Sequence, residues 1–314
     1  MNEANIAAMT DDAPSSPGRE AWRRFVNNKP AVVSAFVLGA LLAITVLWPW
    51  LAPFRPEAMS DVQFGAPGAQ HWFGTDVHGR DLLTRVFNGA RLSLMVGVVG
   101  AGVSLVIGVL WGAVAGYVGG RLDGSMMRFV DVLYSLPSIV FVIVLITTLE
   151  EFFQRWLARV FSPEAGAAAR LLFLIAGLGA VSWLTMARIV RGEVLALRQR
   201  AFIEAAHALG LSHGRILLRH ILPNVSGVII AYLTLTVPTV ILYESFLSYL
   251  GLGIQPPQAS LGTLIAEGAG QINPIRTYWW LLVCPGGVLA ITLLALNFLG
   301  DGLRDALDPK ASQS

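Results

Sequence analysis

The chain has 314 residues, of which 55% are hydrophobic and only 13% are charged, and its mean hydropathy is +0.63. Soluble domains carry about a quarter charged residues, so this composition excludes an ordinary soluble enzyme and predicts an all-α polytopic membrane protein. The net charge of +2 comes with no strongly basic stretch interleaved with aromatic residues, which argues against a nucleic-acid partner.

Six apolar stretches are each long enough, at roughly 20 residues, to cross a bilayer as a helix. We therefore predict six transmembrane helices, at 32–52, 92–116, 130–148, 171–187, 225–250 and 281–299. The remaining divisions follow from these spans: a leader at 1–31, an outer loop at 53–91, a core at 92–299 and a tail at 300–314.

The leader begins with the polar, acidic stretch Met1–Ser16, which we expect to have no fixed structure. The first span is not a secretory signal peptide, because it runs into Trp48 and Trp50 without a small-residue cleavage site. Fourteen of the 22 Lys and Arg residues fall in segments on the leader's side of the membrane. Because basic segments stay in the cytoplasm, both termini are predicted to be cytoplasmic.

The outer loop 53–91 contains the charged residues Asp76, Arg80, Asp81 and Arg85. Asp81 and Arg85 have the i, i+4 spacing of an ion pair on a short amphipathic helix. A structural role is the favoured interpretation. The alternative is that this loop contacts an external partner or gates a path.

The second span has a small residue at every fourth position. These residues are Gly100, Ser104, Gly108, Gly112 and Gly116. Such a stripe allows another helix backbone to approach closely, either within this chain or on a second membrane subunit. After the third span, the stretch 154–170 is longer than a tight connection requires, and we interpret it as a variable outer loop without an assigned role.

The fifth span has hydroxyl-bearing residues on one helical face, with Glu244 beside them. The face consists of Tyr232, Thr236, Thr239 and Tyr243. A carboxylate inside an apolar span is costly unless it is paired or hydrated, so it is a functional-site hypothesis. We predict that this face lines a water-filled path. The alternative is that these groups make interhelical hydrogen bonds, with Glu244 near the outer interface.

A polar island, 201–224, interrupts the apolar spans. Residues 202–209 suit a short helix, Gly210 a left-handed helix end, and Ser212 the start of a second helix. Pro223 then precedes the next span. This pattern predicts a helix, turn and helix at the cytoplasmic surface that serves either as a docking element or as an ordinary interfacial helix.

The sequence carries no signature of catalysis or of a resident cofactor. A phosphate-binding P-loop needs Gly-Lys-Ser/Thr, but the two lysines, Lys29 and Lys310, are followed by proline and alanine. No two histidines stand three or four residues apart, and Cys284 lies alone in an apolar stretch. We therefore predict a non-enzymatic chain that binds neither a metal nor a cofactor.

The island resembles the EAA loop of permease subunits in binding-protein-dependent ABC importers. The matching residues are Glu204, Ala205, Ala206, Gly210, Leu222 and Pro223. The chain departs from the broad pattern at His220, where an aliphatic residue is usual.

Other stretches resemble the peptide-importer branch of that family and its OppC-type oligopeptide permeases. They are FGTDVHGRDLLTRVFNGARLSL at 73–94, SWLTMARIVRGE at 182–193, ESFLSYLGLG at 244–253 and NFLGDGLRDALDPK at 297–310. The resemblance implies a type I ABC importer permease fold in a bacterial inner membrane, with 92–299 as the permease core and 201–224 as the coupling loop.

The same resemblance implies partners. They are a homologous OppB-like permease, two OppD/OppF-like cytoplasmic ATPases that hold ATP and Mg, an OppA-like external binding protein, membrane lipid and a peptide substrate. Dipeptide, glutathione and nickel importers share much of this motif set, so those cargoes remain alternatives. A secondary transporter driven by an ion gradient is a further alternative, but it usually needs several intramembrane ionisable groups, and Glu244 is the one candidate in the sequence.

Overall fold

The computed structural model describes residues 17–160, 163–256 and 258–307, and within them the chain is helical apart from connecting loops and an isolated bridge between Thr75 and Asp81. The helices are, in chain order, α2 (Pro17–Asn27), α3 (Lys29–Leu51), α4 (Leu82–Val118), α5 (Gly120–Tyr134), α6 (Ser138–Val160), α7 (Pro163–Arg198), α8 (Ala201–Ala208), α9 (His213–Ile216), the π-helical turn η1 (Leu217–Ile221), α10 (Leu222–Tyr249), α11 (Leu261–Ala269) and α12 (Trp280–Leu307). The predicted all-α fold is confirmed.

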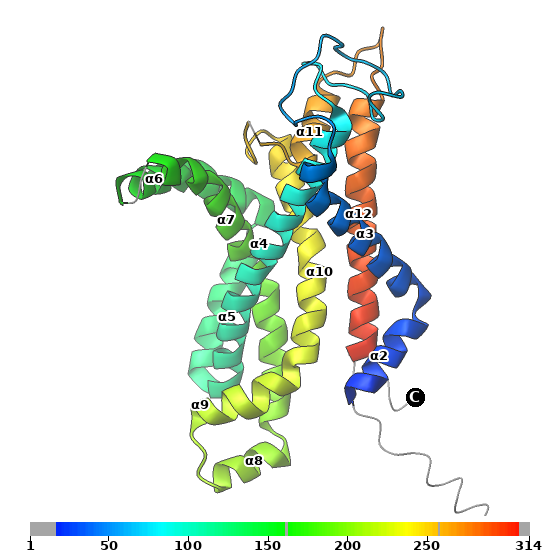
Figure 1. Cartoon of the computed structure of the whole chain (residues 1–314). Helices are drawn as coiled ribbons and strands as arrows, with labels where there is room; N and C mark the ends of the chain where they lie inside the picture. The colour runs from blue at the N-terminus through cyan, green and yellow to red at the C-terminus, as the bar shows by residue number, and fades with distance from the viewer. Residues whose placement is uncertain (1–16, 161–162, 257, 308–314) are drawn as a thin grey trace, which may run out of the picture.

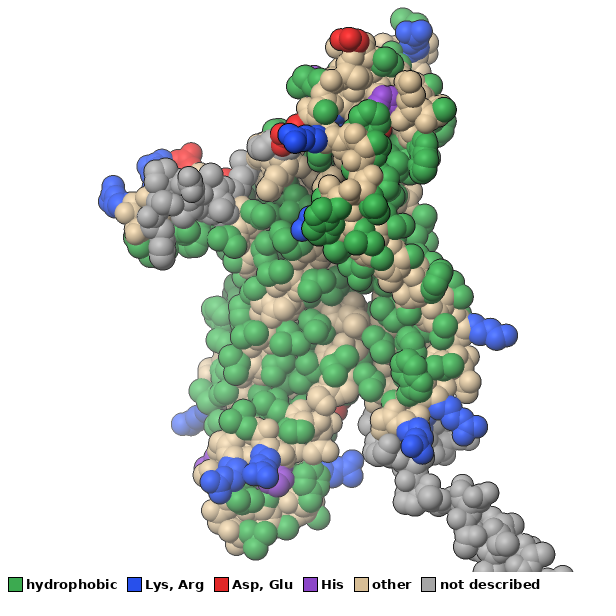
Figure 2. Space-filling model, viewed as in Figure 1, with side chains coloured by type: hydrophobic (Ala, Val, Ile, Leu, Met, Phe, Trp, Pro, Cys, Tyr) green, Lys and Arg blue, Asp and Glu red, His purple; other side chains and the backbone are tan. Residues whose placement is uncertain are grey.

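Five helical segments of the described chain are long and apolar enough to cross a membrane. They are Lys29–Leu51, Leu82–Val118, Leu171–Arg198, His213–Tyr249 and Trp280–Leu307. The bent pair formed by α5 and α6 provides a sixth crossing if it counts as one span. Hydrophobic side chains cover the middle of the molecule, as expected for a surface in contact with lipid (Figure 2).

The predicted third span, 130–148, was wrong as a single helix. The chain breaks between α5 and α6, and the two helices meet at a bend of 86°. Pro137 lies in this break and explains it, because proline has no N–H to donate and disfavours helical geometry in the residue before it. Figure 1 shows α5 running beside α4, whereas α6 turns away from the bundle.

Both ends of the described chain lie at the same end of the molecule as α8 and α9. The loop between α3 and α4, together with α11, lies at the opposite end (Figure 1). Five crossings would leave the two ends on opposite sides of a membrane, whereas a sixth crossing by the bent α5–α6 pair agrees with their arrangement at one end.

The small residues of α4 form a seam with the neighbouring helices of the same chain, chiefly α7. All five members of the stripe are buried. A Cβ atom added at Gly108 or Gly116 would lie 2.9 or 2.8 Å from a backbone oxygen of α7, and one added at Gly112 would clash with the carbonyl oxygen of Ala187. The stripe is therefore internal, and the interpretation that it faces a second membrane subunit was wrong.

Substitution of Gly112 by alanine is expected to destabilise the helix bundle by about 1–3 kcal/mol, because the added methyl group forces α4 away from α7. Gly102 lies on the same helix and has open space around it, so Gly102→Ala serves as the control and should be neutral or slightly stabilising. Denaturant unfolding of both variants in detergent measures the difference. Equal stability of the two variants would contradict the tight α4–α7 seam.

Three predicted boundaries need correction. The leader is partly helical, because α2 spans Pro17–Asn27, while Met1–Ser16 lies outside the described residues. The stretch 154–170 is not an open loop, because α6 continues to Val160 and α7 begins at Pro163. The last span continues into the predicted tail, since α12 ends at Leu307, and the rest of the tail is outside the described residues.

Candidate functional site

The polar island 201–224, which we call the coupling loop, folds as α8, a tight turn and then α9. Gly210 has φ +74°, the left-handed conformation that was predicted for the end of α8. Ser212 is the N-cap residue of α9, although its side chain makes no capping hydrogen bond. Pro223 was predicted to precede the next span, but it lies in the first turn of α10, and η1 leads into α10 without a break.

The coupling loop has an inner face and an outer face. Its inner face packs Ile203, Ala206 and Ile216 into a core cluster with Met186 and Val190 of α7. Residues Glu204, Ala205, Gly210 and Pro223 are exposed, and Leu222 is half-buried. Of the predicted docking residues, Ala206 thus supports the loop from within, while Glu204 and Ala205 are accessible to another protein.

His220 lies in the π-helical turn, where the sequence departs from the EAA pattern. Its side chain is half-buried, and its backbone oxygen accepts a hydrogen bond from Asn224 Nδ2 at 2.6 Å. A π-helical turn adds a residue to the helix and leaves backbone groups without regular partners. The position at which the sequence departs from the EAA pattern therefore lies in an irregular but unbroken stretch of helix.

The hydroxyl-bearing stripe of α10 is partly open. Thr239 is exposed, and the other three members, Tyr232, Thr236 and Tyr243, are half-buried. The hydroxyls of Thr236 and Thr239 donate to backbone oxygens of α10 itself, at 2.7 and 3.2 Å. Glu244 is rotated away from this stripe by one residue, about 100° around the helix, and is buried.

Glu244 is enclosed by serine hydroxyls from three helical segments. Its carboxylate accepts hydrogen bonds from Ser93 on α4 at 3.0 Å, Ser248 at 2.7 Å and Ser245 at 3.4 Å. Ser260, the N-cap of α11, donates to the Ser248 hydroxyl at 3.3 Å. The interhelical interpretation therefore fits Glu244 better than a place on a water-filled path.

Replacement of Glu244 by leucine should destabilise the protein by about 1–3 kcal/mol for each buried hydroxyl that loses its acceptor, principally Ser93 and Ser248. Glu244→Gln is the matched control, because an amide oxygen still accepts one of these bonds, and it should retain most of the stability. Thermal unfolding in detergent compares the two. A leucine variant as stable as the wild-type protein would show that the serine cluster contributes little.

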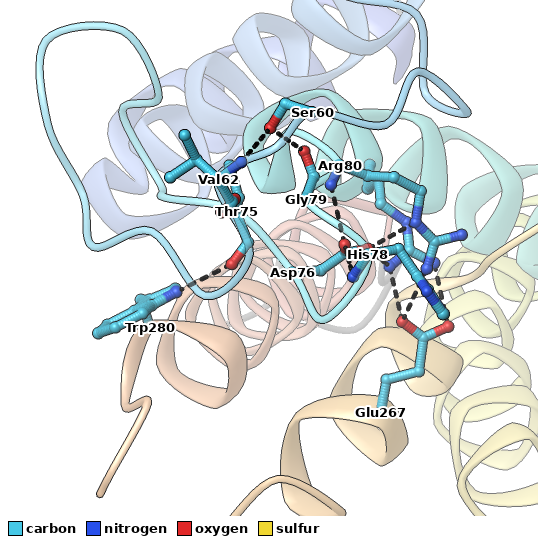
Figure 3. Close-up of polar contacts among 10 residues, drawn as sticks. Ser60, Val62, Thr75, Asp76, His78, Gly79, Arg80, Glu267 and Trp280 are labelled. Carbon is cyan, nitrogen blue, oxygen red and sulfur yellow. Dashed lines mark hydrogen bonds and ion pairs between the residues drawn. The ribbon is translucent and has the colours of Figure 1, made fainter.

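A charged cluster at the opposite end of the molecule joins the outer loop to α4 and α11. The carboxylate of Asp76 accepts hydrogen bonds from the backbone N–H groups of His78 and Arg80 and from Arg80 Nε at 2.7 Å (Figure 3). Arg85 Nη1 also donates to Asp76 at 2.6 Å. Asp76 and Arg85 are only 4% and 5% exposed, so the outer loop is built around a buried ion pair.

Glu267 completes this cluster from α11. Arg85 donates to both oxygens of its carboxylate, at 2.6 and 3.0 Å, and Arg80 lies 3.8 Å away from it. The predicted Asp81–Arg85 pair was therefore wrong. Asp81 instead accepts from the backbone N–H of Thr84 and contacts His71 Nδ1, both at 2.9 Å, so it caps α4.

The predicted short amphipathic helix is not a separate element. Asp81 marks where α4 begins, and no break follows. The predicted helix forms the first turns of α4, which continues to Val118. Sequence reasoning missed Glu267, which lies 182 positions from Arg85 in the chain. The available signal was an acidic residue on a short, otherwise apolar helix.

Among the described residues, no group of three or more His, Cys, Asp or Glu side chains is arranged to hold a metal ion. The charged cluster instead pairs carboxylates with guanidinium groups. These ion pairs hold the outer loop, α4 and α11 together, and we call the cluster a structural clamp.

Comparison with known proteins identifies relatives over most of the chain. Residues 108–313 match the sequence profile of the binding-protein-dependent transport system inner membrane component, and residues 16–67 match that of the N-terminal TM domain of oligopeptide transport permease C.

The chain is 44% identical over 300 residues to the oligopeptide transport system permease protein OppC of Haemophilus influenzae, covering 93% of this chain and 90% of the relative. It is 46% identical over 300 residues to OppC of Escherichia coli K12, covering 93% and 92%. It is 42% identical over 310 residues to the dipeptide transport system permease protein DppC of Bacillus subtilis, covering 98% and 91%.

Among solved structures, the fold is similar to that of a chain of the inward-facing MetNI methionine ABC transporter. The TM-score is 0.55 and the sequence identity 20%, over 72% of this chain and 98% of the other. At that identity the likeness supports the fold alone.

Proposed function

Because the chain belongs to the binding-protein-dependent transport system inner membrane component family, with oligopeptide permeases of the OppC type among its relatives, we propose that it forms half of the translocation path of an ATP-driven oligopeptide importer. The observation that carries this proposal is similarity to OppC proteins over 93% of the chain. The bundle of apolar helices, with polar loops at both ends, fits a multi-pass protein of the inner membrane.

The coupling loop would receive the movement of separate ATPases. Glu204 and Ala205 are exposed on the outer face of α8, while Ile203 and Ala206 fix the same helix to α7 and α9. A short helix held in this way can transmit a displacement to the spans on either side of it. ATP and Mg would be bound by two OppD/OppF-like partners, since neither lysine of this chain lies in a P-loop.

The remaining partners would be an OppB-like permease, which supplies the other half of the path, and an OppA-like binding protein at the end that carries the outer loop. Both termini and the coupling loop would then be cytoplasmic. In support, α2 and the C-terminal end of α12 lie at the same end of the molecule as α8 and α9 (Figure 1). Closure of the ATPases would drive an alternating-access cycle in which this chain performs no covalent chemistry.

The path itself would run along the stripe of Tyr232, Thr236, Thr239 and Tyr243. In support, Thr239 is exposed, and the four side chains of the stripe provide hydroxyl groups along one face of α10. Glu244 would stabilise the wall behind this stripe, because its carboxylate is already bound by serine hydroxyls. The buried, hydrogen-bonded Glu244 does not support the alternative of a carrier driven by an ion gradient.

The cargo is tested by uptake into cells that lack the native gene and carry this chain with its partner subunits. We expect uptake of a labelled tetrapeptide that unlabelled tripeptides and tetrapeptides reduce by competition. Competition by dipeptides alone would favour the DppC-like alternative, which the 42% identity to that relative makes the second candidate. Competition by glutathione or nickel, with none by peptides, would contradict peptide import.

A further inference from the structure

A cavity of about 450 Å³ lies at the root of the coupling loop, where α4 and α7 end. This volume is within the range of small-molecule sites. The principal lining residues are Val114, Tyr117 and Val118 of α4, Arg198 of α7, His207 of α8 and His213 of α9. The cavity is therefore lined by two membrane spans and by both helices of the coupling loop.

The polar groups of the cavity are a guanidinium group, a phenol hydroxyl and two imidazole rings, all of which can donate hydrogen bonds to an anion. Tyr117 Oη and His213 Nδ1 are 2.8 Å apart, and the Tyr117 ring stacks on the ring of His207. Arg198 donates one N–H to the backbone oxygen of Val118 at 3.1 Å, which holds its guanidinium group at the rim. No carboxylate is found among the described lining residues, so the charge that the lining itself contributes is that of the Arg198 guanidinium group.

An apolar track leads along α4 into this cavity. Its members are Val106, Leu110, Val114 and Val118, which are between 39% and 60% exposed. Their spacing of four residues places them on one face of the helix, opposite the small-residue seam that packs on α7. The track extends for about 18 Å along the helix, more than half the thickness of the hydrocarbon core.

We propose that this cavity and track bind one anionic phospholipid, with the phosphate at Arg198 and Tyr117 and an acyl chain along the four aliphatic residues. Two observations select a lipid. The cationic site lies at the end of membrane spans, where headgroups lie, and it is continuous with an exposed apolar face. A soluble phosphate would use the charged groups but not the track.

This site has a consequence beyond transport of a particular cargo. A lipid phosphate held by Arg198 and Tyr117 would connect the end of α7 to α4 and, through the hydrogen bond between Tyr117 and His213, to α9. The bound lipid would thus stiffen the element that moves with the ATPases. The anionic lipid content of the membrane would then set how well ATP hydrolysis and transport are coupled.

Native mass spectrometry of the assembled transporter, titrated with phosphatidylglycerol or phosphatidylcholine, tests the proposal. The wild-type complex should retain one additional phosphatidylglycerol molecule. Arg198→Gln should weaken that binding about fivefold, as expected for the loss of one cationic contact. Arg215→Gln, at an exposed arginine of α9 outside the cavity lining, is the matched control and should bind like the wild type.

A second variant keeps the test informative if the Arg198→Gln protein does not fold. Val114→Phe fills the cavity, keeps every charged group, and should also lower phosphatidylglycerol binding. Equal binding by the Arg198 and Arg215 variants would overturn the proposal. Competition by glycerol phosphate as strong as that by the lipid would also overturn it. A third contradicting result is an assembled complex that binds no phosphatidylglycerol because a partner subunit covers the track.

Discussion

Exchange of Glu204 for arginine should abolish ATP-driven uptake while leaving the membrane spans folded. Glu204 is an exposed carboxylate in the first turn of α8, so its loss removes no buried contact from this chain. We expect Glu204 to form a charge pair that the docked ATPase buries. Truncation of one partner of a buried, hydrogen-bonded charge pair at an interface costs about 2–5 kcal/mol, and charge reversal adds repulsion. We therefore expect ATPase binding to weaken by at least about thirtyfold.

The measurement is co-purification of the ATPases with the permease, together with uptake of a labelled peptide. Glu57→Arg is the matched control, because Glu57 is exposed in the loop at the opposite end of the molecule and undergoes the same charge change. The control should retain its ATPases. Normal ATPase content and full uptake in the Glu204 variant would remove the coupling role from α8.

Replacement of Arg85 by leucine is expected to destabilise the protein by about 3–5 kcal/mol. Arg85 is 5% exposed and pairs with both Asp76 and Glu267, so its loss leaves the buried Asp76 carboxylate without one of its two guanidinium partners. It also removes the ion pair that joins α4 to α11. The outer loop should become susceptible to proteolysis at lower temperature than the rest of the chain.

Arg155→Leu is the control for Arg85, because Arg155 pairs with Glu151 on the exposed surface of α6. An exposed ion pair contributes only about 0–1 kcal/mol, so this variant should unfold close to the wild-type midpoint. Denaturant unfolding in detergent compares the two. If both substitutions had the same small effect, the charged cluster would not be the clamp of the outer end.

Features that depend on neighbouring residues could be predicted from the sequence. Apolar length alone identifies the spans, since a helix in lipid must satisfy its own backbone. The left-handed Gly210 follows from a local pattern as well, because a glycine after a helical stretch is the usual way to end it. The helix, turn and helix of 201–224 could be predicted from the sequence for that reason.

Features that depend on distant contacts could not be predicted. The Asp81–Arg85 spacing suits an ion pair, but Arg85 binds Glu267 because the fold brings α11 against α4. The bend at Pro137 is a local effect of proline and was missed for a different reason, because the hydropathy of an apolar stretch does not report helix direction. Glu244 adjoins the hydroxyl stripe in sequence, yet one residue of helical rotation turns it into the interior.

Peptide uptake into proteoliposomes that contain the assembled transporter tests the central claim most directly. The assay supplies the binding protein at the outer side and ATP at the ATPase side, with all ion gradients collapsed by ionophores. The account predicts that uptake persists without a gradient, stops when ATP is omitted, and requires the ATPase subunits. Uptake by this chain alone, driven by an ion gradient in the absence of ATP, would contradict it.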